Sequence, residues 1–348
     1  MPTPRANPRR TRRTLILAAL AALIAAPAAA AGAGVVNLYS SRHYDTDERL
    51  YADFTEATGI TVNRIEAAAD ELIERMRAEG ANSPADVLIT VDAGRIWRAQ
   101  EAGLLAPVDS EVLNARIPAH LREPDGHWFA FSQRARIIFY DRDRVQTPPA
   151  TYAELADPKW EGMVCTRSAS NIYMLSLLAA QIEHQGEAAA KDWAAGLWNN
   201  RARQPSGGDT DQLRAVASGE CAVAVANTYY FARALRTEVS GLSEHADRIG
   251  WVFPDQSGVG THVNISAGAL AAHAPNRDNA IRFLEYLASD QAQEYFSAGN
   301  DEYPAVPGVG LSESTARLGL FRADALNLAT LGANQSRAQM IYDAVGYR

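Results

Sequence analysis

Two adjacent tyrosines, Tyr229 and Tyr230, are the residues of this chain whose type and spacing most clearly suggest a binding site. They follow an apolar run at 221–226 that is typical of a buried strand, and a helical run at 231–235 comes after them. Two phenols that converge at such a junction suit either an aromatic platform for an organic ligand or a site for a hard metal ion, which prefers oxygen donors. The pair alone leaves both interpretations open.

Two other segments that follow predicted strands carry residues of related chemistry. His43 and Tyr44 lie in a polar turn after a strand at 35–40, and Tyr173 follows a strand that ends at Cys165. In parallel α/β sheets, the segments after the carboxyl ends of strands meet at one edge, where ligands bind. Together the three segments offer one imidazole and four phenols.

Phenol chemistry favours one kind of metal ion. Tyrosine has an ordinary pKa of about 10, so a weakly charged metal ion rarely displaces its proton at neutral pH. A trivalent cation such as Fe(III) does so, because a nearby positive charge favours the ionised form. A site rich in tyrosines and poor in thiols therefore suits Fe(III) better than Zn(II), Cu(I) or Ca(II).

Charge balance at such a site requires a cation nearby. Three phenolates and a neutral histidine would leave Fe(III) close to neutral, whereas a fourth phenolate would leave an excess negative charge that an arginine could balance. Arg134 and Arg136 on a long predicted strand, and Arg42 beside His43, are the candidates.

These residues also have ordinary structural explanations. The chain contains 13 tyrosines, and most tyrosines are core or rim residues. His43 could be a surface residue in a turn, and Arg134 and Arg136 could lie on the solvated side of an alternating strand. Other motifs are weaker still: Gly207-Gly208 lacks the Lys-Ser/Thr of a phosphate loop, and the chain has no HExxH or GxSxG sequence.

The first 33 residues differ in composition from the rest of the chain. Five arginines precede an apolar run at 15–26, and small residues at 28–33 follow, which is typical of a cleavable signal peptide. A membrane anchor is the alternative, but the run is shorter than the roughly 20 residues that a spanning helix needs. The stretch at 11–17 also resembles a twin-arginine export signal. We therefore expect a periplasmic protein.

Net charge and cysteine content limit the function further. Loss of the five arginines of this segment leaves 28 of the 33 basic residues against 41 acidic ones, a net charge of −13. A chain this acidic lacks the positive surface that nucleic acid binding requires. Cys165 and Cys221 are expected to form a disulfide in an exported protein, since their strands could be neighbours. The alternative, a thiolate metal site, lacks any CxxC spacing.

The elements predicted around these residues indicate an α/β protein. In the first third of the chain, strands alternate with helices in a βαβαβ order, which predicts a parallel sheet. The strands are expected at 35–40, 60–65 and 86–90, and the helices at 47–54, 70–78 and 96–102.

Two long extended runs interrupt this alternation and are candidate hinges between two interleaved lobes. They lie near 130–140 and 249–254. Ligands of such bilobal α/β proteins bind in the cleft between the lobes. We expect an N-terminal lobe of 34–132 plus about 255–305, and a C-terminal lobe of about 133–254 plus 306–348.

From residue 35 to the C-terminus the sequence resembles the ferric-ion-binding proteins of bacterial iron ABC transporters. The resemblance implies the type II periplasmic-binding-protein fold, in which two α/β lobes are joined by extended hinge strands. Four motifs in the same order carry it, and the Tyr-Tyr pair is the most specific. The motifs are LYSSRHY at 38–44, SNIY at 170–173, GDTDQ at 208–212 and ANTYY at 226–230.

The resemblance also implies a set of iron ligands. His43 stands where some relatives supply a histidine, so His43, Tyr44 or both coordinate. Arg134 stands where relatives place an arginine near the iron or a synergistic anion. Some relatives carry a glutamate in the first turn and need an anion, but this turn reads Arg-His-Tyr-Asp, which suits the anion-free, tyrosine-rich subtype. The implied tyrosine ligands are Tyr44 from the N-terminal lobe and Tyr173, Tyr229 and Tyr230 from the C-terminal lobe.

Three functional hypotheses follow. The first is an exported, monomeric solute-binding protein, not an enzyme, that captures Fe(III) between its lobes and delivers it to an inner-membrane ABC permease and its ATPase. The second is a protein of the same fold that binds an organic or phosphorylated solute, such as a phosphonate, thiamine or a polyamine, on its tyrosines. The third is an exported enzyme with a tyrosine-rich site, which no motif supports.

Overall fold

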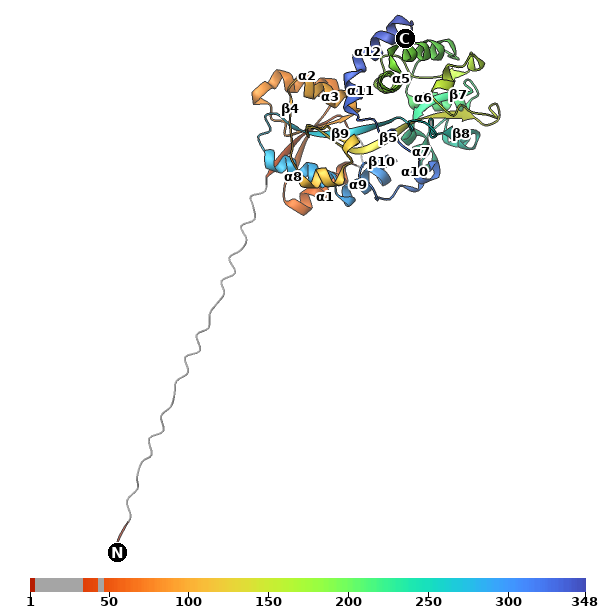
Figure 1. Ribbon diagram of the computed structural model, residues 1–348. Coiled ribbons are helices and arrows are strands. Elements are labelled where there is room, and N and C mark those ends of the chain that lie inside the picture. The colour runs from red at the N-terminus through yellow and green to blue at the C-terminus, as the bar shows by residue number, and fades with distance from the viewer. Residues whose placement is uncertain (4–33, 43–46) are drawn as a thin grey trace. The chain divides into compact units, whose positions relative to one another are not determined.

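The structure is a computed structural model that describes residues 1–3, 34–42 and 47–348 (Figure 1). The predicted signal peptide, apart from its first three residues, and the predicted ligands His43 and Tyr44 lie outside the described residues, so these predictions stay predictions. None of the helices in the described ranges is both long enough and apolar enough to cross a bilayer.

The first third of the chain forms the predicted alternation of strands and helices. Strand β1 pairs in parallel with both β2 and β3, with Leu38 opposite Arg64 on one side and Val87 on the other. The parallel arrangement predicted for these three strands is therefore confirmed. The elements are β1 (Val35–Ser40), α1 (Asp47–Thr58), β2 (Thr61–Glu66), α2 (Ala69–Glu79), β3 (Val87–Val91) and α3 (Ala93–Glu101).

The sheet as a whole is mixed, and the parallel arrangement predicted for the first third of the chain ends at β3. Strand β9 (Val263–Ala271) runs antiparallel to β3, with Val87 opposite Leu270. It arrives from a distant part of the chain and not through a crossover helix, so it can enter the sheet in the opposite direction. The short strands β4 (Leu105–Ala106) and β10 (Tyr303–Pro304) pair with β9 and β5.

The long strand β5 (Phe129–Asp141) belongs to two sheets, as an extended hinge strand should. Its first half pairs with β9, and its second half pairs with β7 (Val223–Asn227) and β8 (Ile249–Val252). Strand β6 (Val164–Cys165) lies parallel to β7. Because β8 remains beside β5, the chain returns to the first sheet within 253–262, slightly later than the predicted run at 249–254.

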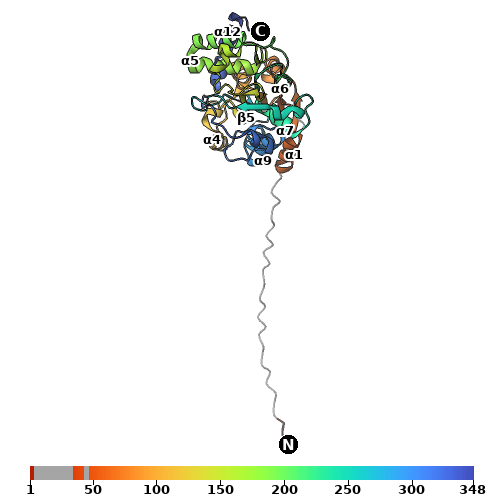
Figure 2. The same cartoon turned by 90° about the vertical axis from the view of Figure 1, so that its right-hand side faces the viewer.

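Helices flank both sides of β5. Helices α5 and α12 lie on one side and α7 lies on the other (Figures 1 and 2). Helix α5 departs from helical geometry at Gly186, where φ is 83°. The larger helices here are α5 (Ile172–Asn199), α6 (Asp209–Ala217), α7 (Thr228–Arg236), α8 (Arg277–Leu287) and α12 (Gln335–Ala344).

Shorter helices complete the described chain. A 3-10 turn lies at Ala153–Ala156. Helix α11 packs against both α3 and α5, and α10 packs against α7. The remaining α-helices are α4 (Glu111–Arg116), α9 (Asp290–Glu294), α10 (Glu313–Leu318) and α11 (Ala329–Ala333); 3-10 turns lie at Gly80–Asn82, Ala119–Leu121, Pro158–Trp160 and Ser243–Arg248, and a π turn at Tyr295–Gly299.

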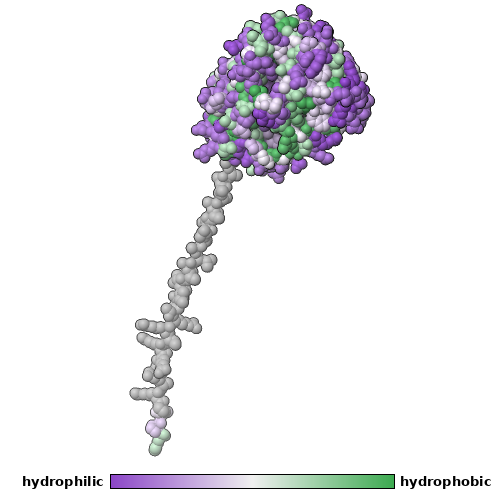
Figure 3. Space-filling model, turned by 45° about the vertical axis from the view of Figure 1, so that its right-hand side comes forward, coloured by the Kyte–Doolittle hydropathy of each residue, from purple (hydrophilic) through white to green (hydrophobic). Residues whose placement is uncertain are grey.

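The predicted disulfide is confirmed. Cys165 is bonded to Cys221, and their Cα atoms lie 5.9 Å apart. The bond ties the end of β6 to the segment that enters β7. Buried apolar side chains form one cluster that extends from the first sheet to α6 and α7, and a second around α5 and α12. The face shown in Figure 3 mixes hydrophilic and apolar residues, as expected for a charged chain.

Candidate metal centre

Three of the predicted ligands lie together in the second half of the molecule. The hydroxyl oxygens of Tyr173 and Tyr229 are 3.5 Å apart. The rings of Tyr229 and Tyr230 are 4.2 Å apart between centroids, with their planes inclined by 31°. The structure thus brings these three phenols to one place, while His43 and Tyr44 lie outside the described residues.

The positions of the tyrosines follow from how two helices begin. Strand β7 leads into α7 without a loop, so Tyr229 and Tyr230 occupy the first turn of the helix. Tyr173 occupies the first turn of α5. The side chain of Asn171 caps this helix by accepting a hydrogen bond from the backbone N–H of Tyr173 at 3.1 Å. The N-terminal end of a helix carries a partial positive charge, and all three tyrosines lie at such an end.

Four guanidinium groups surround the phenols. Arg134 and Arg233 lie 5.9 and 6.0 Å from the ring centroid of Tyr229. Arg136 and Arg167 each lie 5.7 Å from that of Tyr173. The two arginines predicted on the long strand therefore do lie beside the tyrosines.

Buried carboxylates balance part of this positive charge. Glu302 accepts hydrogen bonds from Arg134 at 2.5 Å and from Arg42 at 3.0 Å. Burial raises the pKa of Glu302, but the guanidinium groups of Arg134 and Arg42 outweigh burial and leave that pKa below its ordinary value. Asp209 pairs with Arg136 at 3.0 Å. The arginines are therefore held in fixed positions by anions that are themselves inaccessible to solvent.

Arg42 has a different role from the one expected. It is ion-paired with Asp47, with 3.0 Å between Nε and Oδ2, and both side chains are buried. These two residues flank 43–46 in the sequence. The ion pair therefore joins the two ends of the segment that contains His43 and Tyr44, and Glu302 connects this pair to Arg134.

Some important residues were missed from the sequence. Arg167, Asp209, Arg233 and Glu302 are all in the network around the tyrosines, yet none was a candidate. Asp209 lies within the GDTDQ motif and could have been noticed there. Glu302 is one acid of an Asp-Glu pair that no local pattern distinguishes from a surface residue.

Two polar atoms at the start of α7 fit a ligand or water at this place. Within the part of the chain that the structure describes, Nδ2 of Asn227 and Oγ1 of Thr228 are buried and have no hydrogen-bond partner. The same described ranges contain no group of three or more histidine, cysteine, aspartate and glutamate residues that could hold a metal ion. Phenol oxygens are donors that suit a hard cation.

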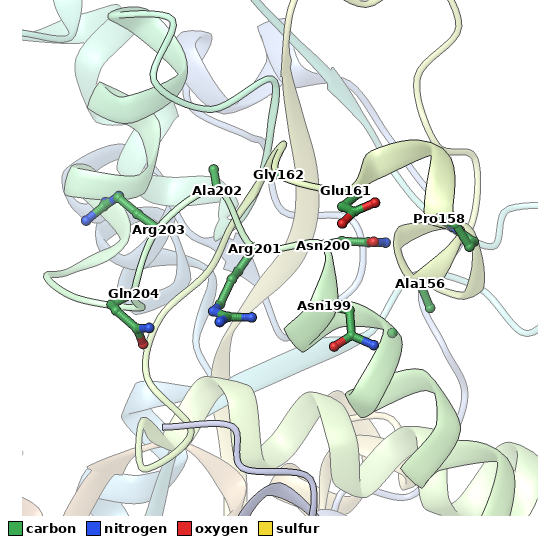
Figure 4. Close-up of a pocket in the computed structure, with 11 residues that line it drawn as sticks. Ala156, Pro158, Glu161, Gly162, Asn199, Asn200, Arg201, Ala202, Arg203 and Gln204 are labelled. Carbon is green, nitrogen blue, oxygen red and sulfur yellow. The ribbon is translucent and has the colours of Figure 1, made fainter.

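Two hollows in the surface differ in their relation to the site. One, of about 570 Å³, is lined by Ser40, Ser41 and Arg95 among others, at the carboxyl ends of the three parallel strands. This is the edge where ligands were expected. A larger one, of about 830 Å³, is polar and lined by Glu161, Arg201 and their neighbours, and none of the three tyrosines contributes to it (Figure 4).

Comparisons with known proteins identify the family of this chain. Residues 49–323 match the family described as bacterial extracellular solute-binding proteins. "Iron uptake protein A1" of Synechocystis sp. is 49% identical over 314 residues, which cover 90% of this chain and 87% of that protein. These matches confirm the predicted family.

Solved structures give the same result for the fold. The structure of Trichodesmium IdiA (FutA) in complex with iron and citrate ligands superposes with a TM-score of 0.88, at 51% identity, and covers 90% of this chain and 100% of that one. The ferric binding protein from Campylobacter jejuni gives a TM-score of 0.84 at 40% identity, with 90% and 100% covered. The bilobal α/β fold is therefore confirmed, and the chain belongs to the bacterial extracellular solute-binding proteins, alongside iron uptake and ferric-binding relatives.

Proposed function

We propose that this protein binds Fe(III) through tyrosine phenolates and delivers it to an inner-membrane ABC permease and its ATPase for iron uptake. The observation that carries the proposal is the meeting of Tyr173, Tyr229 and Tyr230 in the first turns of two helices, surrounded by arginines. The protein acts as a binding protein without turnover, as a monomer, in the periplasm after cleavage of its signal peptide.

The proposed ligands come from two sides. Tyr173, Tyr229 and Tyr230 form a set fixed by the disulfide-linked segments, and His43 and Tyr44 complete it from the segment whose ends are joined by Arg42 and Asp47. Arg134 stands beside this set and offsets the charge of its phenolates. In this arrangement Fe(III) replaces the phenol protons, which leave to solvent.

The two sides belong to two lobes. The N-terminal lobe comprises 34–132 plus about 255–305, and the C-terminal lobe about 133–254 plus 306–348. Strand β5 and the segment at 253–262 connect them, so a change of backbone angles there would open and close the cleft. This division is supported by the two halves of β5, of which the first pairs with β9 and the second with β7 and β8.

A visible absorption titration tests the proposal. Addition of Fe(III) to the purified, metal-free protein should produce a phenolate-to-iron charge-transfer band at one equivalent, and Tyr229→Phe combined with Tyr230→Phe should remove most of it. Tyr286→Phe is a matched control, because its hydroxyl is buried on α8 and has no hydrogen-bond partner among the described residues. A colourless protein that is stabilised against heat by a phosphonate, thiamine or a polyamine, and not by iron, would contradict the proposal.

A further inference from the structure

The GDTDQ motif at 208–212 places a buried carboxylate behind the tyrosines. Asp209 is the first residue of α6 and is 0% exposed. Its Oδ2 accepts hydrogen bonds from Nη1 of Arg136 at 3.0 Å and from the backbone N–H of Asn227 at 2.9 Å, and its Oδ1 lies 4.0 Å from Nε of Arg167. One carboxylate thus joins three segments that are far apart in the sequence.

Each of these segments either lies beside a predicted ligand or is followed along the chain by one. The guanidinium groups of Arg136 and Arg167 both lie 5.7 Å from the ring centroid of Tyr173. Asn227 is the last residue of β7 and directly precedes α7, which carries Tyr229 and Tyr230. Asp209 therefore contacts the immediate supports of all three phenols.

Helix capping does not account for Asp209. The backbone N–H of Gly208, at the N-cap of α6, donates to Oδ2 of Asp211 at 2.7 Å, so a different carboxylate caps this helix. Asp211 is also partly exposed, as capping acids usually are. A buried anion is costly unless it is paired and hydrogen-bonded, so Asp209 is better explained by the arginines that it holds.

The charges beside Tyr173 do not cancel. Arg136 and Arg167 together carry two positive charges and Asp209 carries one negative charge, which leaves an excess of one positive charge beside the ring of Tyr173. The same carboxylate that orients the two guanidinium groups therefore also limits how much positive charge an incoming Fe(III) ion meets.

We propose that Asp209 is a positioning residue of the Fe(III) site: it orients Arg136 and Arg167 against Tyr173 and fixes the start of α7, so that the phenols of Tyr173 and Tyr229 meet. This inference rests on the proposed function. It assigns a role to the motif at 208–212, and that role is to hold the tyrosine set in a geometry that binds iron.

The test compares two isosteric substitutions in one turn of α6. Asp209→Asn should lower the Fe(III) affinity, measured by competition with citrate, by about 10- to 100-fold, and should shift the charge-transfer band. In the metal-free protein it should also change the near-ultraviolet circular dichroism of the tyrosines. Asp211→Asn removes the same charge and loosens the cap; it should lower the melting temperature while leaving the band and the affinity within about threefold of wild type.

A third variant keeps the test decisive if Asp209→Asn fails to fold. The side chain of Arg167 is 23% exposed, so Arg167→Gln should be tolerated; it leaves the Asp209–Arg136 pair intact and removes one guanidinium from Tyr173. It should shift the band and lower the affinity by about tenfold. If Arg167→Gln and any folded Asp209→Asn retain the wild-type band and affinity, the inference is wrong. If wild type itself gives no band, the proposed function is wrong instead.

Discussion

The hydroxyl oxygens of Tyr173 and Tyr229 lie 3.5 Å apart. The sequence separation between these two tyrosines is 56 residues, which equals the separation between the disulfide-bonded Cys165 and Cys221. Each tyrosine therefore follows its half-cystine at the same distance along the chain. One path runs from β6 into the start of α5, and the other runs through β7 into α7. The disulfide holds the starts of these two segments together, and the two phenols come into contact eight residues further along each segment.

This relationship predicts that loss of the disulfide weakens both the fold and the iron site. Replacing Cys165 and Cys221 together by serine should lower the free energy of unfolding by about 4 kcal/mol, since the bridge closes a loop of this length. Urea unfolding of the metal-free protein measures the loss. Wild type treated with a reductant should match the variant. Equal unfolding midpoints for oxidised wild type and the double variant would contradict the prediction.

Local patterns predicted the elements around the site because strand and helix periodicity are properties of neighbouring residues. Tyr229 and Tyr230 follow an apolar strand and begin a helix, as the run at 221–226 indicated. Arg134 and Arg136 are two residues apart on β5, so a strand presents both on one face. Both lie beside tyrosines for that reason.

The partners of those arginines could not be predicted in the same way. Glu302 and Arg134 are 168 residues apart, and Asp209 and Arg136 are 73 apart, so each pairing depends on the folded topology. The direction of β9 also depends on the folded topology. It is antiparallel because the chain re-enters the first sheet from the second, and nothing in the sequence of β9 itself records that path.

Glu302 should be essential for stability. Its buried carboxylate balances Arg42 and Arg134, and Glu302→Gln would leave both guanidinium groups without that charge. Removing one partner of a buried ion pair costs about 3–5 kcal/mol, so we expect the urea midpoint to fall accordingly. Glu294→Gln, at an exposed position on α9, is the control and should change stability by about 0.5 kcal/mol or less. A Glu302→Gln variant as stable as this control would refute the prediction.

A hydrogen bond from α5 to the residue after β3 should also contribute. Oγ of Ser176 donates to Oδ2 of Asp92 at 2.7 Å, and both residues are buried. Asp92 has a φ of 101°, a conformation that is strained for a residue with a side chain, so it depends on its contacts. Ser176→Ala should lower the free energy of unfolding by about 1.5–3 kcal/mol. Ser170→Ala, at an exposed position, should leave the free energy of unfolding unchanged. Equal effects of Ser176→Ala and Ser170→Ala would show that the Ser176–Asp92 hydrogen bond contributes nothing.

His262 should make the metal-free protein sensitive to mild acid. The residue is 3% exposed. Burial lowers the pKa of its imidazole from 6.5 to about 4; Asp324 opposes this change, while Arg136 and His184 add to it. The folded chain therefore holds His262 neutral at a pH where the unfolded chain protonates it. Its contribution to stability is complete above about pH 6.5 and decreases as the pH falls toward 4, by about 3 kcal/mol.

Urea midpoints measured at intervals between pH 7 and pH 4.5 separate this contribution from the rest. In His262→Gln the urea midpoint should depend less steeply on pH than in wild type. This holds whatever stability the substitution costs at pH 7, because the slope of the midpoint against pH depends on the protonation of His262. His273→Gln, at an exposed position, should retain the wild-type slope. Metal-free protein must be used, since loss of bound iron in acid would add a slope of its own. If wild type and His262→Gln lose stability in parallel, the protonation of His262 does not drive acid unfolding.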